Sequence, residues 1–279
     1  MDERYIRLSQ GHLNLLALCP RKFQHAFLDQ LSAPPTPKQQ EKQLWGTQFH
    51  LLMQQRQLDL PVERLAQTDP PLQQCLAALA QAAPEIVAPV AGDGDRDRTL
   101  RQSEHLRSLR FGSWLLVAVY DLLIAAPDRA QILDWKTYPQ RPSTQTRLAK
   151  DWQTRLYPFL LAETSRYRSE QISMTYWFVQ GRSPSEPPQP QQLTFPYSQS
   201  LHEQTRQELN DRLDRLGQWL AAYQQQDEPF PQVEASEPCQ FCSFAARCQR
   251  GDFSGRATPE TATLTNLDAI KEIPLPEIV

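Results

Sequence analysis

Residues 114–136 read WLLVAVYDLLIAAPDRAQILDWK, and this stretch decides the fold. Two short apolar runs, 114–126 and 130–136, have the composition of β-strands, and the tripeptide Pro-Asp-Arg between them is a turn signal. We therefore predict two antiparallel strands joined as a hairpin.

The polar residues of this hairpin form a pattern. Asp134 and Lys136 are two residues apart, so a strand places both on one face beside Ile132. Asp121 is expected to end the first strand, in phase with apolar positions where an aspartate is costly unless it binds something. If the strands pair, Asp121 and Asp134 converge on a divalent cation, with His50 from a helix as a further ligand.

Such a site suits phosphodiester hydrolysis. The metal would polarise a phosphoryl oxygen and activate a water molecule, and Lys136 would neutralise the developing negative charge. A simpler interpretation is open: Asp134 and Lys136 are an exposed strand pair, Asp121 faces water, and His50 is a hydrogen-bonded core residue. The spacing of aspartate and lysine alone does not decide between them.

The segments on either side predict helices and further strands. A helix over 38–58 points Trp45 and Phe49 at a core and carries His50 on a neighbouring stripe. A second helix, Arg147 to Arg166, brings Gln153 and Tyr157 onto one face at i and i+4. The remaining predicted elements are a first helix broken at Cys19-Pro20, a helix over 72–82, a strand over 171–180 that pairs with 193–197, and a helix over 200–226.

Three cysteines lie close together near the end of the chain. The sequence PCQFCSFAARCQR gives Cys239, Cys242 and Cys248 as C-x2-C-x5-C, a compact metal-binding spacing that lacks a fourth ligand. Cys19, in LCPRKF, is the best candidate for that ligand and would tie the two ends of the chain together. Spacing does not choose the metal, because thiolates bind zinc and iron–sulfur clusters alike. A buried apolar Cys19 with a zinc knuckle completed by another residue is the alternative.

The overall charge limits how nucleic acid could bind. The 279 residues hold 29 basic and 32 acidic side chains, a net charge of -3, so there is no global attraction to a polyanion. Binding would depend on local basic residues, namely Arg21, Lys22, Arg141, Arg147, Lys150 and Arg155. Since no apolar run approaches the roughly 18 residues of a membrane span, we expect no membrane association and a cytoplasmic protein, where cysteines are ligands or free thiols rather than disulfides.

Taken together in their order, the motifs resemble the RecB-type branch of the PD-(D/E)XK nucleases, particularly the iron–sulfur members found in AddB-type helicase–nuclease subunits and in CRISPR adaptation. The motifs are LSQGHLNLLALCPRKF (8–23), GTQFH ending at His50, Asp121 closing a strand, ILDWKT (132–137), QTRLY (153–157) and C-x2-C-x5-C. Two positions depart from the pattern: Val119 stands where a glycine is frequent, and the second acidic residue, Asp134, is not a glutamate.

The resemblance implies a restriction-endonuclease-like α/β fold: a mixed central sheet flanked by helices, with a helical N-terminal segment and a C-terminal cap closed by an iron–sulfur cluster. It implies one or two Mg2+ or Mn2+ ions held by His50, Asp121, Asp134 and the main-chain carbonyl of Trp135. Lys136 would be catalytic, with Gln153 and Tyr157 contacting the DNA end or shaping the site. A structural 4Fe–4S cluster would bind Cys19, Cys239, Cys242 and Cys248.

We accordingly expect one nuclease domain over residues 1–250, with a catalytic core at about 100–198 and an irregular tail over 251–279. The expected function is metal-dependent exonuclease action on single-stranded or end-accessible DNA, in repair, recombination or CRISPR adaptation, with a helicase or a CRISPR-adaptation protein as partner. The alternative is a DNA-end-binding or adaptor module that keeps the fold and the cluster but has weak catalysis.

Overall fold

The computed structural model describes residues 5–31, 35–62, 69–87, 99–180, 187–235 and 237–250. The chain divides into two compact units, Met1–Val233 and Glu234–Val279. The first unit contains every described strand and the candidate catalytic residues. The expected irregular tail over 251–279 lies outside the described residues.

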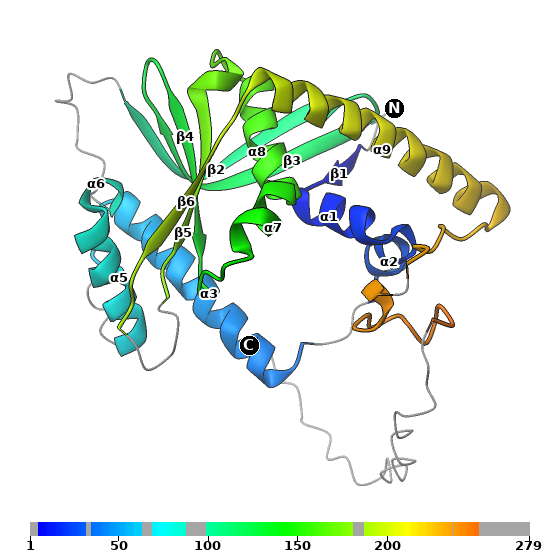
Figure 1. Ribbon diagram of the computed structural model, residues 1–279, viewed down its shortest axis with the longest axis horizontal. Coiled ribbons are helices and arrows are strands. Elements are labelled where there is room, and N and C mark those ends of the chain that lie inside the picture. Colours follow the sequence, from blue (N-terminus) through cyan, green and yellow to red (C-terminus); the bar gives the residue numbers. More distant parts are fainter. Residues whose placement is uncertain are drawn as a thin grey trace, which may run out of the picture. The chain divides into compact units, whose positions relative to one another are not determined.

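A six-stranded mixed sheet forms the centre of the first unit (Figure 1). β3 and β4 are the predicted hairpin, and β5 pairs with β6 as expected, both pairs being antiparallel. β4 and β5 run parallel, and the order across the sheet is β1-β3-β4-β5-β6, with β2 paired to β3. The strands are β1 Ile6–Leu8, β2 Leu100–Phe111, β3 Trp114–Ala125, β4 Ala130–Lys136, β5 Ile172–Phe178 and β6 Gln191–Pro196.

Helices account for most of the remaining described chain. The predicted break in the first helix is confirmed at Cys19, because Pro20 lacks an N–H group and begins a new helix. Among the described helices, none combines the length and the apolar character needed to cross a bilayer. The helices are α1 Gln10–Leu18, α2 Pro20–Phe23, the π-helical turn η1 Gln24–Leu28, α3 Pro37–Gln57, α5 Pro70–Ala82, α6 Pro84–Val87, α7 Thr144–Lys150, α8 Trp152–Glu163, η2 Ser169–Gln171, α9 Gln199–Gln226 and η3 Glu237–Cys239.

Helices cover both faces of the sheet, which confirms the expected architecture. On one face, Tyr120 of β3 and Ile132 of β4 are buried in a core with α1, α8 and α9. On the other face, Leu122, Leu133 and Trp135 are buried in a second core with α3, α5 and α6. Ile132 and Leu133 of β4 face opposite cores, as the alternation of a strand requires. In β3 the alternation is broken at Asp121, since Tyr120 and Leu122 are two residues apart and yet face opposite cores. The result is a three-layer arrangement of helices, sheet and helices.

The single helix predicted over 147–166 is wrong, because the chain bends at Asp151. α7 ends there, and Asp151 takes an extended backbone conformation, with φ -70° and ψ 139°. Its side chain accepts a hydrogen bond from the backbone N–H of Gln153 and so caps α8. The new helix starts at Trp152, one residue before Gln153, and this start fixes where Gln153 points.

β3 covers almost all of the predicted run, from Trp114 to Ala125, and has two different neighbours on one edge. β2 pairs along β3 except at Asp121, so β1, at residues 114–116, and β4, at residues 122–125, share the opposite edge. Between them, residues 117–121 have no strand partner on that edge within the described chain. Asp121 thus lies inside β3 and not at its end, which corrects the prediction, because the strand continues to Ala125 and pairs with β4 only beyond the aspartate.

Candidate active site and metal centre

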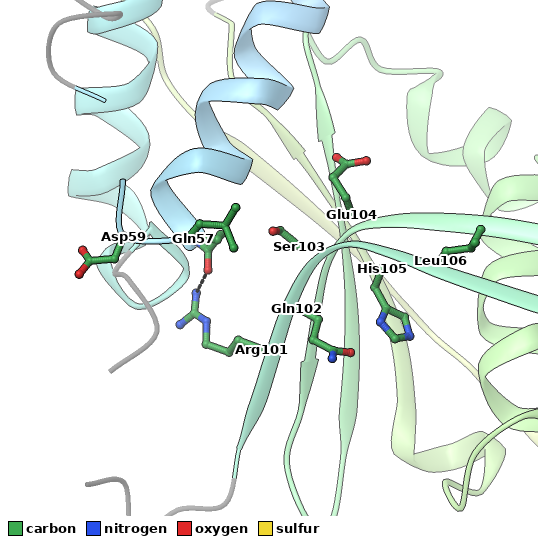
Figure 2. A pocket seen from close by; sticks show the side chains of 9 residues that line it. Gln57, Asp59, Arg101, Gln102, Ser103, Glu104, His105 and Leu106 are labelled. Carbon is green, nitrogen blue, oxygen red and sulfur yellow. Dashed lines mark hydrogen bonds between the residues drawn. The ribbon is translucent and has the colours of Figure 1, made fainter. Parts of the chain in front are cut away.

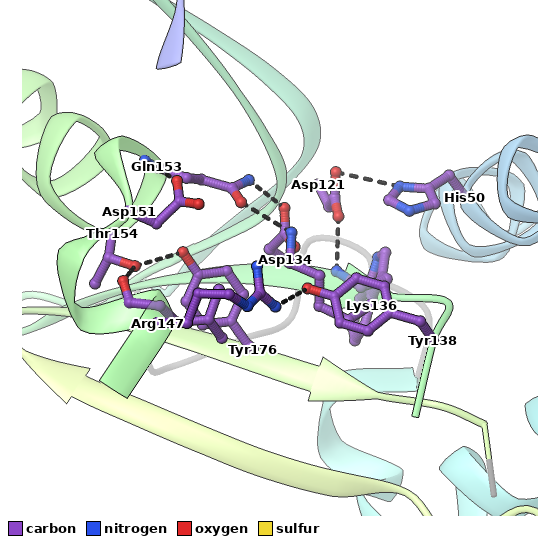
Figure 3. A network of polar contacts seen from close by, with 12 residues as sticks. His50, Asp121, Asp134, Lys136, Tyr138, Arg147, Asp151, Gln153, Thr154 and Tyr176 are labelled. Carbon is purple, nitrogen blue, oxygen red and sulfur yellow. Dashed lines mark hydrogen bonds and ion pairs between the residues drawn. The ribbon is translucent and has the colours of Figure 1, made fainter. Parts of the chain in front are cut away.

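The two aspartates of the hairpin meet where β3 and β4 separate (Figure 3). Leu122 and Leu133 are the last pair of the β3–β4 ladder, and one further step would place Asp121 opposite Asp134. Instead of continuing the ladder, Asp121 accepts a hydrogen bond on Oδ2 from the backbone N–H of Trp135, at 2.7 Å. The structure therefore brings Asp121 and Asp134 together, as the sequence predicts. We call the place where β3 and β4 separate beside these two aspartates the fork.

Asp134 and Lys136 lie on one strand face and are held by the same glutamine. The Lys136 ammonium is 2.5 Å from Asp134 Oδ1, and it donates to Gln153 Oε1 at 2.8 Å. The Gln153 amide donates in turn to Asp134 Oδ2 at 2.5 Å. Because Asp134 is only 4% exposed, this triangle is an internal part of the protein. The interpretation as an exposed strand pair does not fit.

His50 and Glu104 reach the fork from α3 and β2. His50 Nδ1 lies 3.3 Å from Asp121 Oδ1. One ligand atom from each of His50, Glu104 and Asp121 lies within 4.8 Å of the others, a spacing that suits one metal ion. Glu104 could not be expected from the sequence, because its strand, LRQSEHLRSLRF, is too polar to be recognised as a strand without its partner. The one indication in the sequence was that Glu104 is an acidic residue in the polar segment just before the β3–β4 hairpin.

Charges at the fork shift one another's protonation. Burial, together with the charge of Asp134, raises the pKa of Asp121 above its usual range. Burial and then the charge of Asp121 raise the pKa of Glu104. Burial works against a charged His50 or Lys136, but their carboxylate neighbours outweigh it and raise the pKa of both. The carboxylates repel one another, so a bound cation would stabilise the site.

The donor atoms fit a small divalent cation. Carboxylate oxygens suit Mg2+ and Mn2+, which prefer oxygen to sulfur, whereas the single imidazole is a ligand more typical of softer divalent ions. The carbonyl of Trp135 fits as well, because the N–H and C=O of a strand residue point to the same edge, and this N–H reaches Asp121. The Asp134 carboxylate is less available as a metal ligand, since its two oxygens already contact Lys136 and Gln153.

Tyr157 lies beneath the fork and not at its surface. Its side chain is 4% exposed, and its hydroxyl makes a hydrogen bond with the backbone of Val119, on the stretch of β3 that lacks a strand partner. Its carbonyl accepts from the hydroxyl of Tyr120, at 2.8 Å. Of the two roles expected for Tyr157, this placement favours shaping the site over contacting the DNA end.

Two contacts from distant parts of the sequence position the site. Asn14 of α1 donates to Asp151 at 2.9 Å and accepts from the backbone N–H of Trp152 at 3.0 Å, which anchors the start of α8 and so Gln153. On α3, a Cβ atom added to Gly46 would lie 3.0 Å from Thr137 Oγ1. Because Gly46 has no side chain, α3 can lie close to the end of β4 at this position. Gly46 is one helical turn before His50.

The three clustered cysteines lie in the second unit, in a series of tight turns. The backbone N–H of Cys242 bonds to the carbonyl of Cys239, and that of Cys248 to the carbonyl of Phe244. All three thiols are unoxidised and partly exposed, as is that of Cys19 in the first unit. Within the described residues, these cysteines do not form a group spaced closely enough for a single metal ion.

Comparisons with known proteins agree with this architecture. Residues 7–249 match the family model of the PD-(D/E)XK nuclease superfamily. The crystal structure of a "putative exonuclease" from Eubacterium rectale superposes with a TM-score of 0.51 at 10% identity, over 88% of each chain, a likeness in fold. The structure of SSO0001 gives a TM-score of 0.38 at 11% identity, also over 88% of each chain. No curated protein matches significantly.

Proposed function

Because the chain belongs to the PD-(D/E)XK nuclease superfamily, we propose that it is a Mg2+- or Mn2+-dependent deoxyribonuclease that acts as an exonuclease on single-stranded or end-accessible DNA. The observation that carries the proposal is the fork, where Asp121, Asp134 and Lys136 lie together within reach of His50. The similarity in fold to a protein described as an exonuclease supports the narrower activity.

The proposed ligands are His50, Asp121, the carbonyl of Trp135 and Asp134, which would turn one oxygen from Lys136 or Gln153 to the cation. When bound, the cation polarises a phosphoryl oxygen and lowers the pKa of its water molecule. The Lys136 ammonium neutralises negative charge that develops on the phosphate, where a fixed charge in a water-poor site is most effective. Gln153 keeps Lys136 and Asp134 in register through its two hydrogen bonds.

Basic side chains around α7 are the proposed phosphate contacts. Arg141, Arg147 and Lys150 are exposed, and Arg147 donates to the hydroxyl of Tyr138 at 3.2 Å, two residues after Lys136. Arg155 is a weaker candidate than the sequence suggests, because it pairs with Glu208 at 2.7 Å. Three exposed charges beside the fork would give the local attraction that the net charge of -3 does not.

The resemblance to RecB-type nucleases supports a role in DNA repair, recombination or CRISPR adaptation, with a helicase or an adaptation protein as partner. The second candidate function is DNA-end binding without efficient cleavage. The ion pair of Lys136 with Asp134 favours the enzyme, because a binding module has no need of a buried ammonium at a carboxylate fork.

Circular and linear single-stranded DNA of one sequence test the proposed activity. With Mg2+ or Mn2+ present, an exonuclease shortens the linear strand and leaves the closed circle intact, because it needs an end. Loss of the circle at the same rate would show endonuclease action. A shift of both DNAs in a gel, with neither shortened over a long incubation, would favour the binding module.

We further propose that Cys19, Cys239, Cys242 and Cys248 hold a structural 4Fe–4S cluster and define a nuclease domain over residues 1–250. The C-x2-C-x5-C spacing supports this proposal. A cubane bonds each thiolate to a different iron, so its sulfur ligands lie farther apart than those of one ion. In the second unit, Cys239, Cys242 and Cys248 are not close enough together for a single metal ion, which weighs more against zinc than against a cluster.

Cys239→Ala is expected to lower the iron content and the visible absorption of protein purified without oxygen, and to lower its thermal stability. Cys75→Ala is the matched control, because burial and then the charge of Asp69 raise the pKa of the Cys75 thiol to about 11 and keep it protonated. Metal analysis and an absorption spectrum check both variants. Wild-type protein that contains zinc and no iron would contradict the cluster.

A further inference from the structure

We infer that Glu104 is an additional ligand of the cation at the fork, joining His50 and Asp121 from the strand on the far side of β3. The inference rests on the proposed function and adds a residue that the family resemblance does not supply. One ligand atom from each of these three side chains lies within 4.8 Å of the other two.

The ladder between β2 and β3 is interrupted at this residue alone. Ser103 pairs with Leu122 and His105 with Tyr120, so the register is the same on both sides. The position opposite Asp121 is therefore Glu104, and it is the one residue of β2 missing from the pairing. Because the register is unchanged, the interruption does not slip one strand past the other. It coincides with the point where β3 changes face, between Tyr120 and Leu122.

The backbone of Glu104 is left-handed, with φ 48°. Residues with a Cβ atom avoid this region, and such strain persists where the surroundings impose it, most often at functional sites. Here the unusual conformation coincides with the carboxylate that meets His50 and Asp121. A regular strand would have left Glu104 in the ladder, so we attribute the strain to the placement of this carboxylate.

Among the described residues, no lysine or arginine pairs with Glu104, and the favourable charge that acts on it is that of His50. Arg101, on the same strand, donates instead to the side chain of Gln57 and to the carbonyl of Ile86 (Figure 2). Lys136 is occupied by Asp134. Two carboxylates this close repel each other in the absence of a cation, which makes the site costly when empty and favourable when filled.

An open cavity borders β2 at Glu104. It has a volume of about 450 Å³ and is lined by Gln57, Leu58, Asp59 and residues 101–106, with Glu104 on its wall (Figure 2). A hydrated ion can therefore reach Glu104 without any movement of the core. The cavity also leaves room for the water molecules that Mg2+ retains when protein groups bind it.

Glu104→Gln tests the inference on protein without DNA. The amide keeps the shape and removes the charge, so Mn2+ affinity measured by calorimetry should fall by at least about tenfold. In EDTA the variant should melt at the same temperature as wild type or higher, because the repulsion with Asp121 is relieved. In Mn2+ it should gain less stability than wild type does. Glu41→Gln, an exposed change of the same kind on α3, should match wild type in both buffers.

Two results would overturn the inference. Unchanged Mn2+ affinity in Glu104→Gln would remove Glu104 from the ligand set, and a lower melting temperature in EDTA would show that Glu104 is structural. Glu104→Gly separates the effect of backbone strain from that of charge, since glycine adopts the left-handed conformation readily. This variant should also lose Mn2+ affinity, because it lacks the carboxylate. If wild type cleaves DNA while these variants bind Mn2+ normally, only the role of Glu104 fails. If wild type binds no Mn2+, the proposed function fails too.

Discussion

Asp134→Asn is expected to slow DNA cleavage by roughly 10²–10³-fold or more while the protein remains folded. The asparagine has the same size, so Gln153 and Lys136 stay close to their places. What is lost is the negative charge that would hold the cation and fix the ammonium of Lys136. The loss also relieves Asp121 of a neighbouring charge that raises its pKa, which offsets part of the cost to stability.

The measurement is single-turnover cleavage of end-labelled DNA, with thermal unfolding recorded on the same preparation. Asp128→Asn is the matched control: it makes the same chemical change in the exposed turn at the other end of the β3–β4 hairpin. The control should cleave like wild type. Cleavage by pure Asp134→Asn at the wild-type rate would remove Asp134 from the active site.

Lys136→Met is expected to abolish most cleavage and, unlike Asp134→Asn, to destabilise the protein. The methionine keeps the apolar part of the side chain and removes the ammonium. Asp134, whose side chain is 6% exposed, is then buried beside Asp121 without its counter-charge. Breaking a buried ion pair in this way costs about 3–5 kcal/mol in free energy of unfolding.

Mn2+ should restore part of the lost stability in Lys136→Met, because a bound cation compensates the same carboxylates. Cleavage should not return, since the charge that faces the phosphate is still absent. Denaturant unfolding with Mn2+ and with EDTA measures the first effect, and the DNA assay measures the second. Lys42→Met, at an exposed position of α3, is the control for removing a lysine. Full activity in Lys136→Met would contradict the catalytic role.

The hairpin and the shared face of Asp134 and Lys136 could be predicted because both follow from local pattern. A strand has a period of two, and an apolar run with a turn signal at its middle has few other ways to fold. Gln153 was also found, although the helix that carries it begins later than predicted. The start of α8 depends on Asn14, 137 residues away from Asp151, and local periodicity carries no trace of that contact.

Glu104 and the true position of Asp121 could not be predicted in the same way. Among the described strands, β2 pairs only with β3, and it exposes part of its surface, so its sequence lacks an apolar signal. The left-handed turn of Glu104 is imposed by tertiary contacts. Val119, which departs from the family pattern, turns out to be harmless: its side chain is 41% exposed, and its backbone bonds to Tyr157.

The most direct test of the nuclease assignment is the release of nucleotides from end-labelled, linear single-stranded DNA by the purified wild-type protein. Parallel reactions contain Mg2+, Mn2+ or EDTA. The fork of Asp121, Asp134 and Lys136 predicts degradation with either metal ion and none in EDTA. Cleavage that persists in EDTA, or intact DNA in both metal ions under conditions where the protein binds it, would contradict a metal-dependent nuclease.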